Sequence, residues 1–349
     1  MELAKCDTIN VTSFYNDPET PHHLERVRNA FGAPETDYHA LRRSLPTAAM
    51  QSIRLLGMFK DLVMRDNARE LNRYDAIVTV EDTVASARRL GISHPRLIYL
   101  PHGCGDRARG FTREVRAFDH VLLPGEKSAR RMLDEGLIRA DNHSVIGAVK
   151  LETCATLRHA GQPLFAQKRP TVLYNAHKAR GLSSWSRFIE PMLEQFSSQD
   201  AFNLIVAPHT KMFRRRAQSV RDRWLGRSNA TIRIDPGSDA CVDMTYTMAS
   251  DIYVGDVSSQ VYEFLVKPRP CVFLNAHNID WRDNPDFAHW HLGDVIDDPR
   301  DLTAAIQAAP ARHGLYRARQ EDMAARSLGD TTPGAALRGA CAIQDFLRA

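Results

Sequence analysis

The sequence of 349 residues lacks the patterns that mark membrane and secreted proteins. No apolar run approaches the length of a membrane span. Residues 1–20 contain Asp, Glu and Asn and have no apolar core of a signal peptide. The six cysteines are scattered without a C-x-x-C pair, which is typical of reduced thiols in a cytosolic protein. We therefore expect a cytoplasmic protein.

Several catalytic and metal-binding motifs are missing as well. There is no G-x-x-x-x-G-K-[ST] loop, no G-x-G-x-x-G opening a helix after the first strand, and no G-x-S-x-G elbow. The pairs His22-His23 and His289-x-His291 have no carboxylate or cysteine set at ligand spacing, so we expect no metal and no cofactor. The net charge of +4 is too small to indicate nucleic acid, although it suits an anionic substrate or an anionic membrane surface.

What the chain does have is an alternation of apolar strands and helices. With 43% hydrophobic and 25% charged residues it is typical of a globular protein, and its length allows two domains. Apolar runs predict strands at 8–14, 76–80, 96–100, 119–123 and 143–146, and again at 171–175, 202–207, 231–234, 251–254 and 270–274. Intervening helices imply βαβ units and parallel sheets. We predict an α/β protein of two Rossmann-like domains facing a central cleft.

The domain limits follow from composition. Residues 159–170 are polar, contain two prolines and indicate a linker. We therefore predict an N-terminal acceptor domain over 1–158 and a C-terminal nucleotide-donor domain over 171–330. Residues 331–349 form a C-terminal helix that can pack back on the first domain.

The most informative stretch is 255–264, where an apolar strand meets a polar turn and a helix start. Gly255 lets the chain bend, and Ser258 or Ser259 can cap the helix beside unpaired amides. Such a helix start binds phosphate, and Glu263, about one turn further on, can accept hydrogen bonds from ribose hydroxyls. The alternative is an ordinary N-cap after a strand.

Polar side chains follow the other predicted strands too. His102 follows 96–100, and His209 and Lys211 follow 202–207. After 171–174 come Asn175, His177, Lys178 and Arg180. The carboxyl ends of parallel strands meet at one edge, so these groups converge there. Histidine exchanges protons near neutral pH, and cations stabilise phosphate charge. The set predicts transfer from a nucleotide-activated donor, although any one of these histidines alone is also typical of an ordinary polar residue.

Residues 47–69 show apolar side chains at helical spacing together with several basic residues. One interpretation is a helix that turns its apolar face to the core and its basic face to water. The other is a surface that touches anionic lipid, which would place the protein at the inner face of the plasma membrane.

Five short motifs occur in an order that points to a known family. They are His102-Gly103 at a strand end, Ser183-Ser184-Trp185, Pro208-His209, the run Asp256-Val257-Ser258-Ser259-Gln260-Val261-Tyr262-Glu263-Phe264, and Gly329-Asp330. In these the chain resembles the CDP-glycerol glycerophosphotransferase family of teichoic-acid and capsule synthesis, which has a GT-B fold. More distantly it resembles UDP-N-acetylglucosamine 2-epimerases and GT-B glycosyltransferases.

The resemblance implies a metal-independent transferase that moves a phosphoalcohol group from a CDP-activated donor to a hydroxyl of a glycan or lipid acceptor. It implies that His102 is the base for the acceptor hydroxyl and that His209 stabilises phosphate charge. The implied donor-binding residues are Asn175, His177, Lys178, Arg180, Lys211, Asp256, Ser258, Ser259, Glu263 and Asp330.

The chain also departs from the family pattern. Cys104-Gly105-Asp106-Arg107 follows His102-Gly103 where the family has T-P-x-K, and Val257 replaces a tyrosine. These departures keep two alternatives open. One is a glycosyltransferase with a nucleotide-sugar donor, and the other is a non-catalytic module that binds a nucleotide diphosphate.

Overall fold

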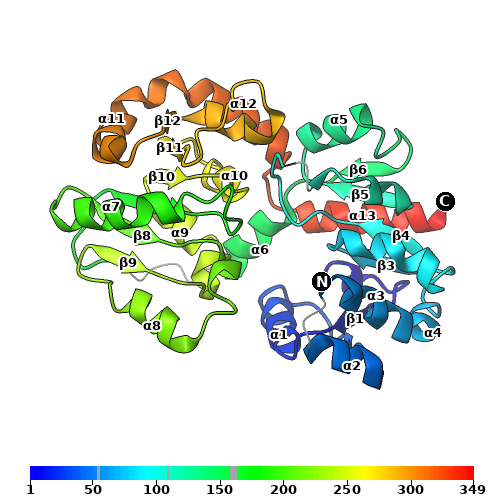
Figure 1. The fold of residues 1–349 in the computed structure, drawn as a ribbon. Coiled ribbons are helices and arrows are strands. Elements are labelled where there is room, and N and C mark those ends of the chain that lie inside the picture. The colour runs from blue at the N-terminus through cyan, green and yellow to red at the C-terminus, as the bar shows by residue number, and fades with distance from the viewer. Residues whose placement is uncertain (53–55, 108–109, 158–162) are drawn as a thin grey trace. The chain divides into compact units, whose positions relative to one another are not determined.

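The computed structural model describes residues 1–52, 56–107, 110–157 and 163–349. The chain divides into two compact units (Figure 1). Unit 1 comprises Met1–Cys104, Arg109–Leu157 and Arg326–Ala349, and unit 2 comprises Gly105–Ala108 and Arg158–Ala325. The C-terminal residues thus belong with the N-terminal half of the chain. The predicted linker 159–170 begins in residues 158–162, which lie outside the described part.

Unit 1 contains a four-stranded parallel sheet in the order β3-β4-β5-β6. Its strands are β3 (Ala76–Thr79), β4 (Arg96–Tyr99), β5 (His120–Leu123) and β6 (His143–Val145). Its later helices are η2 (Asp82–Leu90), η4 (Arg113–Ala117), α5 (Glu126–Asp134), α6 (Val149–Leu157) and α13 (Ala335–Arg348). Alternate strand residues face opposite sides of this sheet. Leu97 and Val121 belong to one core cluster, while Ile98 and Leu122 pack with Ile343 of α13.

The first part of unit 1 contains a second, smaller sheet. Strands β1 (Thr12–Tyr15) and β2 (Asp37–Ala40) pair in parallel as a two-stranded sheet. The helices of this part are η1 (Leu3–Lys5), α1 (Thr20–Ala30), α2 (Leu45–Ser52), α3 (Leu56–Asp66) and α4 (Ala68–Leu71). The helix predicted over 47–69 therefore corresponds to three helices, with residues 53–55 outside the described part. Val63 of α3 is 2% exposed, so this helix does bury an apolar face.

Unit 2 is built on a six-stranded parallel sheet with the order β12-β11-β10-β7-β8-β9. Its strands are β7 (Thr171–Asn175), β8 (Asn203–Val206), β9 (Ile232–Ile234), β10 (Ile252–Gly255), β11 (Cys271–Leu274) and β12 (Asp294–Ile296). The chain starts at β7, adds β8 and β9 on one side, and then returns to add β10 to β12 on the other. The topological switch point therefore lies between β7 and β10, where open α/β sheets bind ligands.

Helices cover the sheet of unit 2 and bury its core (Figure 1). They are α7 (Trp185–Ser197), α8 (Gln218–Leu225), α9 (Thr245–Ala249), α10 (Gln260–Phe264), α11 (Leu302–Arg312) and α12 (Arg317–Leu328). Short 3-10 turns are η5 (Thr210–Met212), η6 (Asp239–Cys241), η7 (Pro285–Leu292), η8 (Pro299–Asp301) and η9 (His313–Leu315). Phe188 and Met192 of α7 are fully buried against Val172 and Leu204. The strands of this sheet are apolar at nearly every position, because side chains of the core cover both of its faces.

The predicted α/β class with two Rossmann-like units is confirmed. Some individual helices and strands differ from the prediction. Between β8 and β9 the expected helix is a 3-10 turn, η5, followed by the short α8. Pro310 is the third-last residue of α11, which continues to Arg312 although proline supplies no main-chain N–H there. Strands β2 and β12 were not predicted, since both are short and only partly apolar. Among the described residues, no helix has the length and hydropathy needed to cross a bilayer.

Candidate functional site

Asp256 joins the two strand ends at the switch point of unit 2. It follows β10 and is 1% exposed. Its carboxylate accepts hydrogen bonds from His177 N at 2.8 Å, Ser184 N at 2.6 Å, Ser184 Oγ at 2.8 Å and its neighbour Val257 N at 2.6 Å. Burial raises the pKa of Asp256, while the hydrogen bonds from Ser184 act in the opposite direction. The carboxylate therefore fixes the loop after β7 against the turn after β10.

His177 lies in that loop with both ring nitrogens facing N–H donors. Nδ1 accepts from Ala179 N at 3.0 Å, and Nε2 lies 2.7 Å from Nη1 of Arg107. Burial, reinforced by the charge of Arg107, lowers the pKa of His177 to about 4. The imidazole is therefore neutral at pH 7 and 6% exposed.

His209 supplies a second imidazole beside the first. It follows the carboxyl end of β8, the strand next to β7, and its ring centroid lies 6.0 Å from that of His177 in an edge-on arrangement. Nδ1 of His209 accepts from Lys211 N at 3.2 Å. In the neutral ring this acceptor role leaves the proton on Nε2, which can then donate to an anionic oxygen.

The serines after β10 are present at the predicted turn, but they do not form the predicted side-chain cap in full. Ser259 holds the N-cap position of α10 without a capping bond from its side chain. Ser258 Oγ accepts from Gln260 N at 3.3 Å. Both serines are partly exposed, and Glu263 inside α10 is 9% exposed.

The remaining predicted residues are distributed differently. Asn175 is 2% exposed and donates to Ala207 O at 2.7 Å, so its amide ties β7 to β8. Lys178, Arg180 and Lys211 have exposed side chains in unit 2.

His102 and Asp330 belong to unit 1. The His102 side chain is exposed after β4. Asp330 accepts from Thr332 N at 2.9 Å and from Thr332 Oγ1 at 2.6 Å. The predicted residues thus fall into a group in unit 2 around His177 and a pair in unit 1.

Sequence reasoning did not assign three residues that the structure brings to this site. Ser184 was noted only as part of a motif, yet it supplies two of the donors to Asp256. Asp106 and Arg107 were read as departures from a family pattern, yet both contact residues of unit 2. The signal in the sequence was a pair of opposite charges, Asp106 and Arg107, directly after Gly105.

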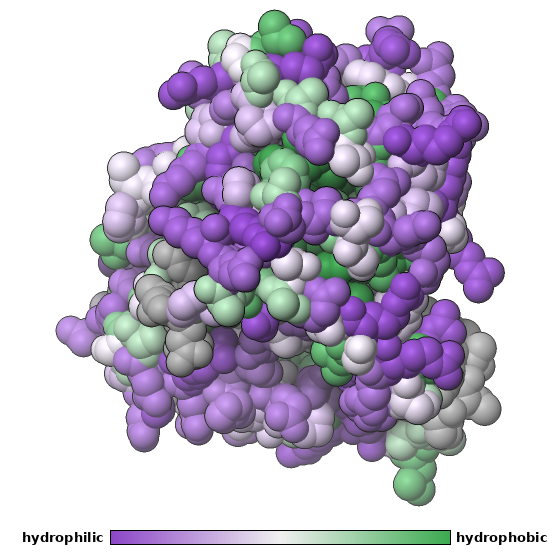
Figure 2. Space-filling view, turned by 90° about the vertical axis from the view of Figure 1, so that its left-hand side faces the viewer, coloured by the Kyte–Doolittle hydropathy of each residue, from purple (hydrophilic) through white to green (hydrophobic). Residues whose placement is uncertain are grey.

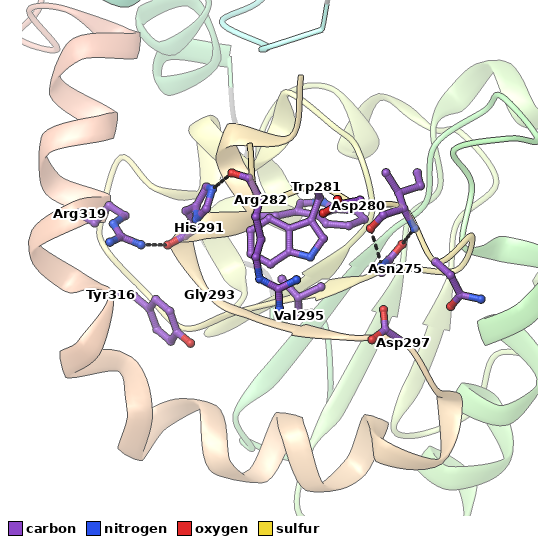
Figure 3. A pocket seen from close by; sticks show the side chains of 13 residues that line it. Asn275, Asp280, Trp281, Arg282, His291, Gly293, Val295, Asp297, Tyr316 and Arg319 are labelled. Atoms are coloured by element: carbon purple, nitrogen blue, oxygen red, sulfur yellow. Dashed lines mark hydrogen bonds between the residues drawn. The ribbon is translucent and has the colours of Figure 1, made fainter. Parts of the chain in front are cut away.

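A separate hollow of about 540 Å³ lies at the β12 edge of unit 2 (Figure 3). Trp281, Arg282 and His291 line it, and the His291 ring contacts the carbonyl of Arg282 at 2.9 Å. Arg319 of α12 lies beside His291 and donates to its carbonyl oxygen at 3.2 Å. None of the residues predicted from the sequence lines this hollow.

The surface is mostly hydrophilic on the face that Figure 2 shows, with apolar groups scattered among polar ones. Large apolar side chains of unit 2 that stay exposed, such as Leu225 at 44% and Val242 at 43%, are ordinary for a protein surface. Within the described residues no group of three or more His, Cys, Asp or Glu side chains is arranged to hold a metal ion. Metal independence itself stays a prediction.

Comparisons with known proteins bear on the fold. No protein-family model and no curated protein matches the sequence. Among solved structures, MnaA of S. aureus with UDP has a TM-score of 0.62 at 13% identity, covering 97% of each chain. The UDP-GlcNAc 2-epimerase of Neisseria meningitidis bound to UDP-GlcNAc has a TM-score of 0.60 at 15% identity, covering 99% of this chain and 94% of that one. The wall teichoic acid polymerase TagF, soaked with CDPG, has a TM-score of 0.57 at 11% identity, covering 97% and 88%. These likenesses confirm the predicted GT-B-like fold.

Proposed function

We propose that the protein is a transferase that uses a nucleotide-diphosphate donor bound by unit 2. The observation that carries the proposal is the pair of strand ends at the switch point. There Asp256 holds the loop of His177 against the turn of Ser258 and Ser259. Ligands of open α/β sheets bind at this point, and the polar groups present suit a phosphate better than an apolar ligand.

Each group has a role that its chemistry supports. Ser258 and Ser259 donate hydroxyl hydrogen bonds to the diphosphate, and Lys178, Arg180 and Lys211 balance its charge. His209 donates from Nε2 to the leaving phosphate, because its Nδ1 accepts from Lys211 N. Glu263 accepts hydrogen bonds from the ribose hydroxyls.

We favour a CDP-activated alcohol as donor, on the strength of the Asp256–Phe264 motif. In the reaction an acceptor hydroxyl loses its proton to His102 and its oxygen bonds to the phosphorus that carries the alcohol. The bond from that phosphorus to the bridging oxygen breaks, and CMP leaves with both bonding electrons. The acceptor is a hydroxyl of a glycan or lipid.

A nucleotide-sugar glycosyltransferase is the second candidate. It is favoured by the likeness in fold to enzymes whose structures hold UDP or UDP-GlcNAc. The same binding residues would hold the nucleotide, but the acceptor oxygen would attack an anomeric carbon and a nucleoside diphosphate would leave. Fold alone cannot separate the two reactions.

The test is a calorimetric titration of the whole protein with CDP-glycerol, CDP, UDP-GlcNAc and UDP, repeated with the double variant Ser258→Ala and Ser259→Ala. We expect at least one of these ligands to bind and the double variant to weaken it without changing the melting temperature. Release of CMP or of UDP in the presence of candidate acceptors then distinguishes the two reactions. Binding without turnover would identify a non-catalytic module, and no binding at millimolar concentrations would overturn the proposal.

A further inference from the structure

The segment Gly105–Arg107 is fastened to unit 2 by a buried carboxylate. Asp106 is 5% exposed, and its Oδ2 accepts from the hydroxyl of Tyr262 and from Nδ1 of His289 at 3.2 Å. Tyr262 and His289 are 1% and 2% exposed, so the anchor is internal to the unit. Gly105 adds a close approach, because a Cβ there would lie 3.2 Å from Cβ of Ser259. The small residue therefore lets the segment lie against the turn after β10.

The anchor and the His177 loop are tied to the same residue. Nε2 of His289 lies 3.1 Å from the carbonyl oxygen of Asp256, while the carboxylate of Asp256 accepts from His177 N. Both ring nitrogens of His289 thus face oxygen acceptors. Arg107, which follows Asp106 directly, and His177 are consequently fixed in one frame, the residues around Asp256.

The N–H donors around the His177 ring outnumber the acceptors that the neutral ring offers. The guanidinium of arginine is always protonated and has only donors. A neutral imidazole carries one proton, so one of its nitrogens must donate. Yet Nε2 faces Nη1 of Arg107 at 2.7 Å and Nδ1 faces the amide of Ala179 at 3.0 Å. Whichever nitrogen carries the proton, two donors point at each other.

An anionic oxygen resolves this conflict, since it accepts from both groups at once. With Nδ1 accepting from Ala179, the proton sits on Nε2, and an oxygen beside it accepts from His177 and from Arg107. Lys178 adds positive charge near this point, and the His209 ring lies 6.0 Å from that of His177. A phosphate offers several such oxygens, and the arginine fork matches two of them.

We propose that Arg107, a residue outside the predicted donor set, binds the diphosphate of the donor jointly with His177. The inference rests on the proposed function and deepens it. It gives Arg107 a binding role and Asp106 a positioning role. The site selects for phosphate rather than for base or sugar, because its contacts are donors aimed at an anion.

The experiment compares Arg107→Gln and Arg107→Lys with the wild-type protein and with Arg317→Gln, an exposed arginine of α12 that pairs with Glu321. Calorimetry measures the affinities for CDP, UDP, cytidine, uridine and inorganic pyrophosphate, and thermal unfolding verifies the fold of each variant. Loss of a charge-assisted hydrogen bond is expected to weaken the nucleoside diphosphates and pyrophosphate about 10- to 100-fold in Arg107→Gln. Arg107→Lys keeps the charge but not the fork, so its loss is smaller. Affinities for the nucleosides, and all affinities of Arg317→Gln, stay unchanged.

The outcomes separate this inference from the proposed function. If the wild type binds a nucleoside diphosphate and Arg107→Gln binds it equally well, the role of Arg107 is wrong and the proposed function stands. If pyrophosphate binds in an Arg107-dependent way but none of the nucleotides does, the anion site stands and the proposed function falls. Equal weakening of nucleosides and diphosphates would also overturn the inference, because it would show a general loss of structure. If neither pyrophosphate nor any nucleotide binds the wild type, both are overturned.

Discussion

Replacing Asp256 by Asn tests whether one buried carboxylate holds the switch-point site together. The substitution keeps the side-chain volume and one acceptor oxygen. The other oxygen, however, becomes an amide group with two donors. Ser184 N and Ser184 Oγ both donate to Oδ2, at 2.6 and 2.8 Å, while Val257 N donates to Oδ1 at 2.6 Å. In either orientation of the amide, buried donors face donors.

The size of the effect follows from these contacts. A buried polar group left unsatisfied costs about 1–3 kcal/mol, and hydrogen bonds to a charged group are worth about 1.5–3 kcal/mol against about 1 for neutral ones. Relief of the desolvation that raises the pKa of Asp256 offsets part of this loss. We expect a net loss of about 3 kcal/mol, which for a unit of this size is about 6–12 °C in melting temperature.

The assay can be made specific to unit 2. The four tryptophans, Trp185, Trp224, Trp281 and Trp290, all lie there, so urea unfolding followed by tryptophan fluorescence reports this unit. Asp200→Asn, at an exposed position before β8, is the matched control and should change stability by less than about 0.5 kcal/mol. Nucleotide affinity should fall with Asp256→Asn even well below its unfolding transition. A variant with the stability and affinity of the wild type would refute the assignment of Asp256 as the link between the strand ends.

Further predictions address the chemistry and the surface. His102→Ala should lower kcat about 100- to 10,000-fold with donor affinity unchanged, as measured by steady-state kinetics and calorimetry; near-normal turnover would remove its role as base. Activity should survive EDTA, and full loss restored by Mg²⁺ would reveal a metal site. Burial and Arg107 lower the pKa of His177 to about 4, below the ordinary value near 6.5. As the pH falls, the His177 side chain therefore binds a proton in the unfolded chain before it does so in the folded protein, which favours unfolding. The free energy of unfolding should be highest above about pH 6.5 and should decline toward pH 4, and the decline should be shallower in His177→Asn. An equal decline in both proteins would contradict the lowered pKa of His177. Finally, if residues 47–69 touch anionic lipid, the protein should co-sediment with anionic vesicles and be released by salt.

The fold was predictable because it depends on patterns that are local in the sequence. Runs such as Val172–Tyr174 and Ile252–Val254 are apolar throughout. Such runs are typical of strands that are buried on both faces of a parallel sheet. A parallel sheet then places whatever follows each strand at one edge. For this reason His177 and His209 could be placed together from the sequence alone, and their rings do lie 6.0 Å apart.

The detailed contacts of the site were not predictable, since they depend on pairings far apart in the chain. The carboxylate of Asp256 was expected to bind the donor. In the structure its oxygens accept from residues 72 to 79 positions away as well as from its neighbour. No sequence pattern distinguishes an aspartate that binds a ligand from one that holds two loops together. Likewise, nothing local in the chain groups Gly105–Ala108 with unit 2.

The contacts of Asp106 and Arg107 offer a physical reason for the departure from the family motif after His102-Gly103. The family pattern has a lysine where this chain has Arg107, and Asp106 stands at a position that the pattern leaves open. A lysine acts as a mobile point charge, but an arginine holds its donors in a rigid fork that is useful only if the main chain is fixed. Asp106 provides that fixation through Tyr262 and His289. Asp106 and Arg107 therefore make sense as a pair: the aspartate anchors the segment, and the anchored arginine directs its charge at the same point as His177. On this reasoning Asp106→Asn should weaken diphosphate binding only while Arg107 is present, and should have no further effect in Arg107→Gln.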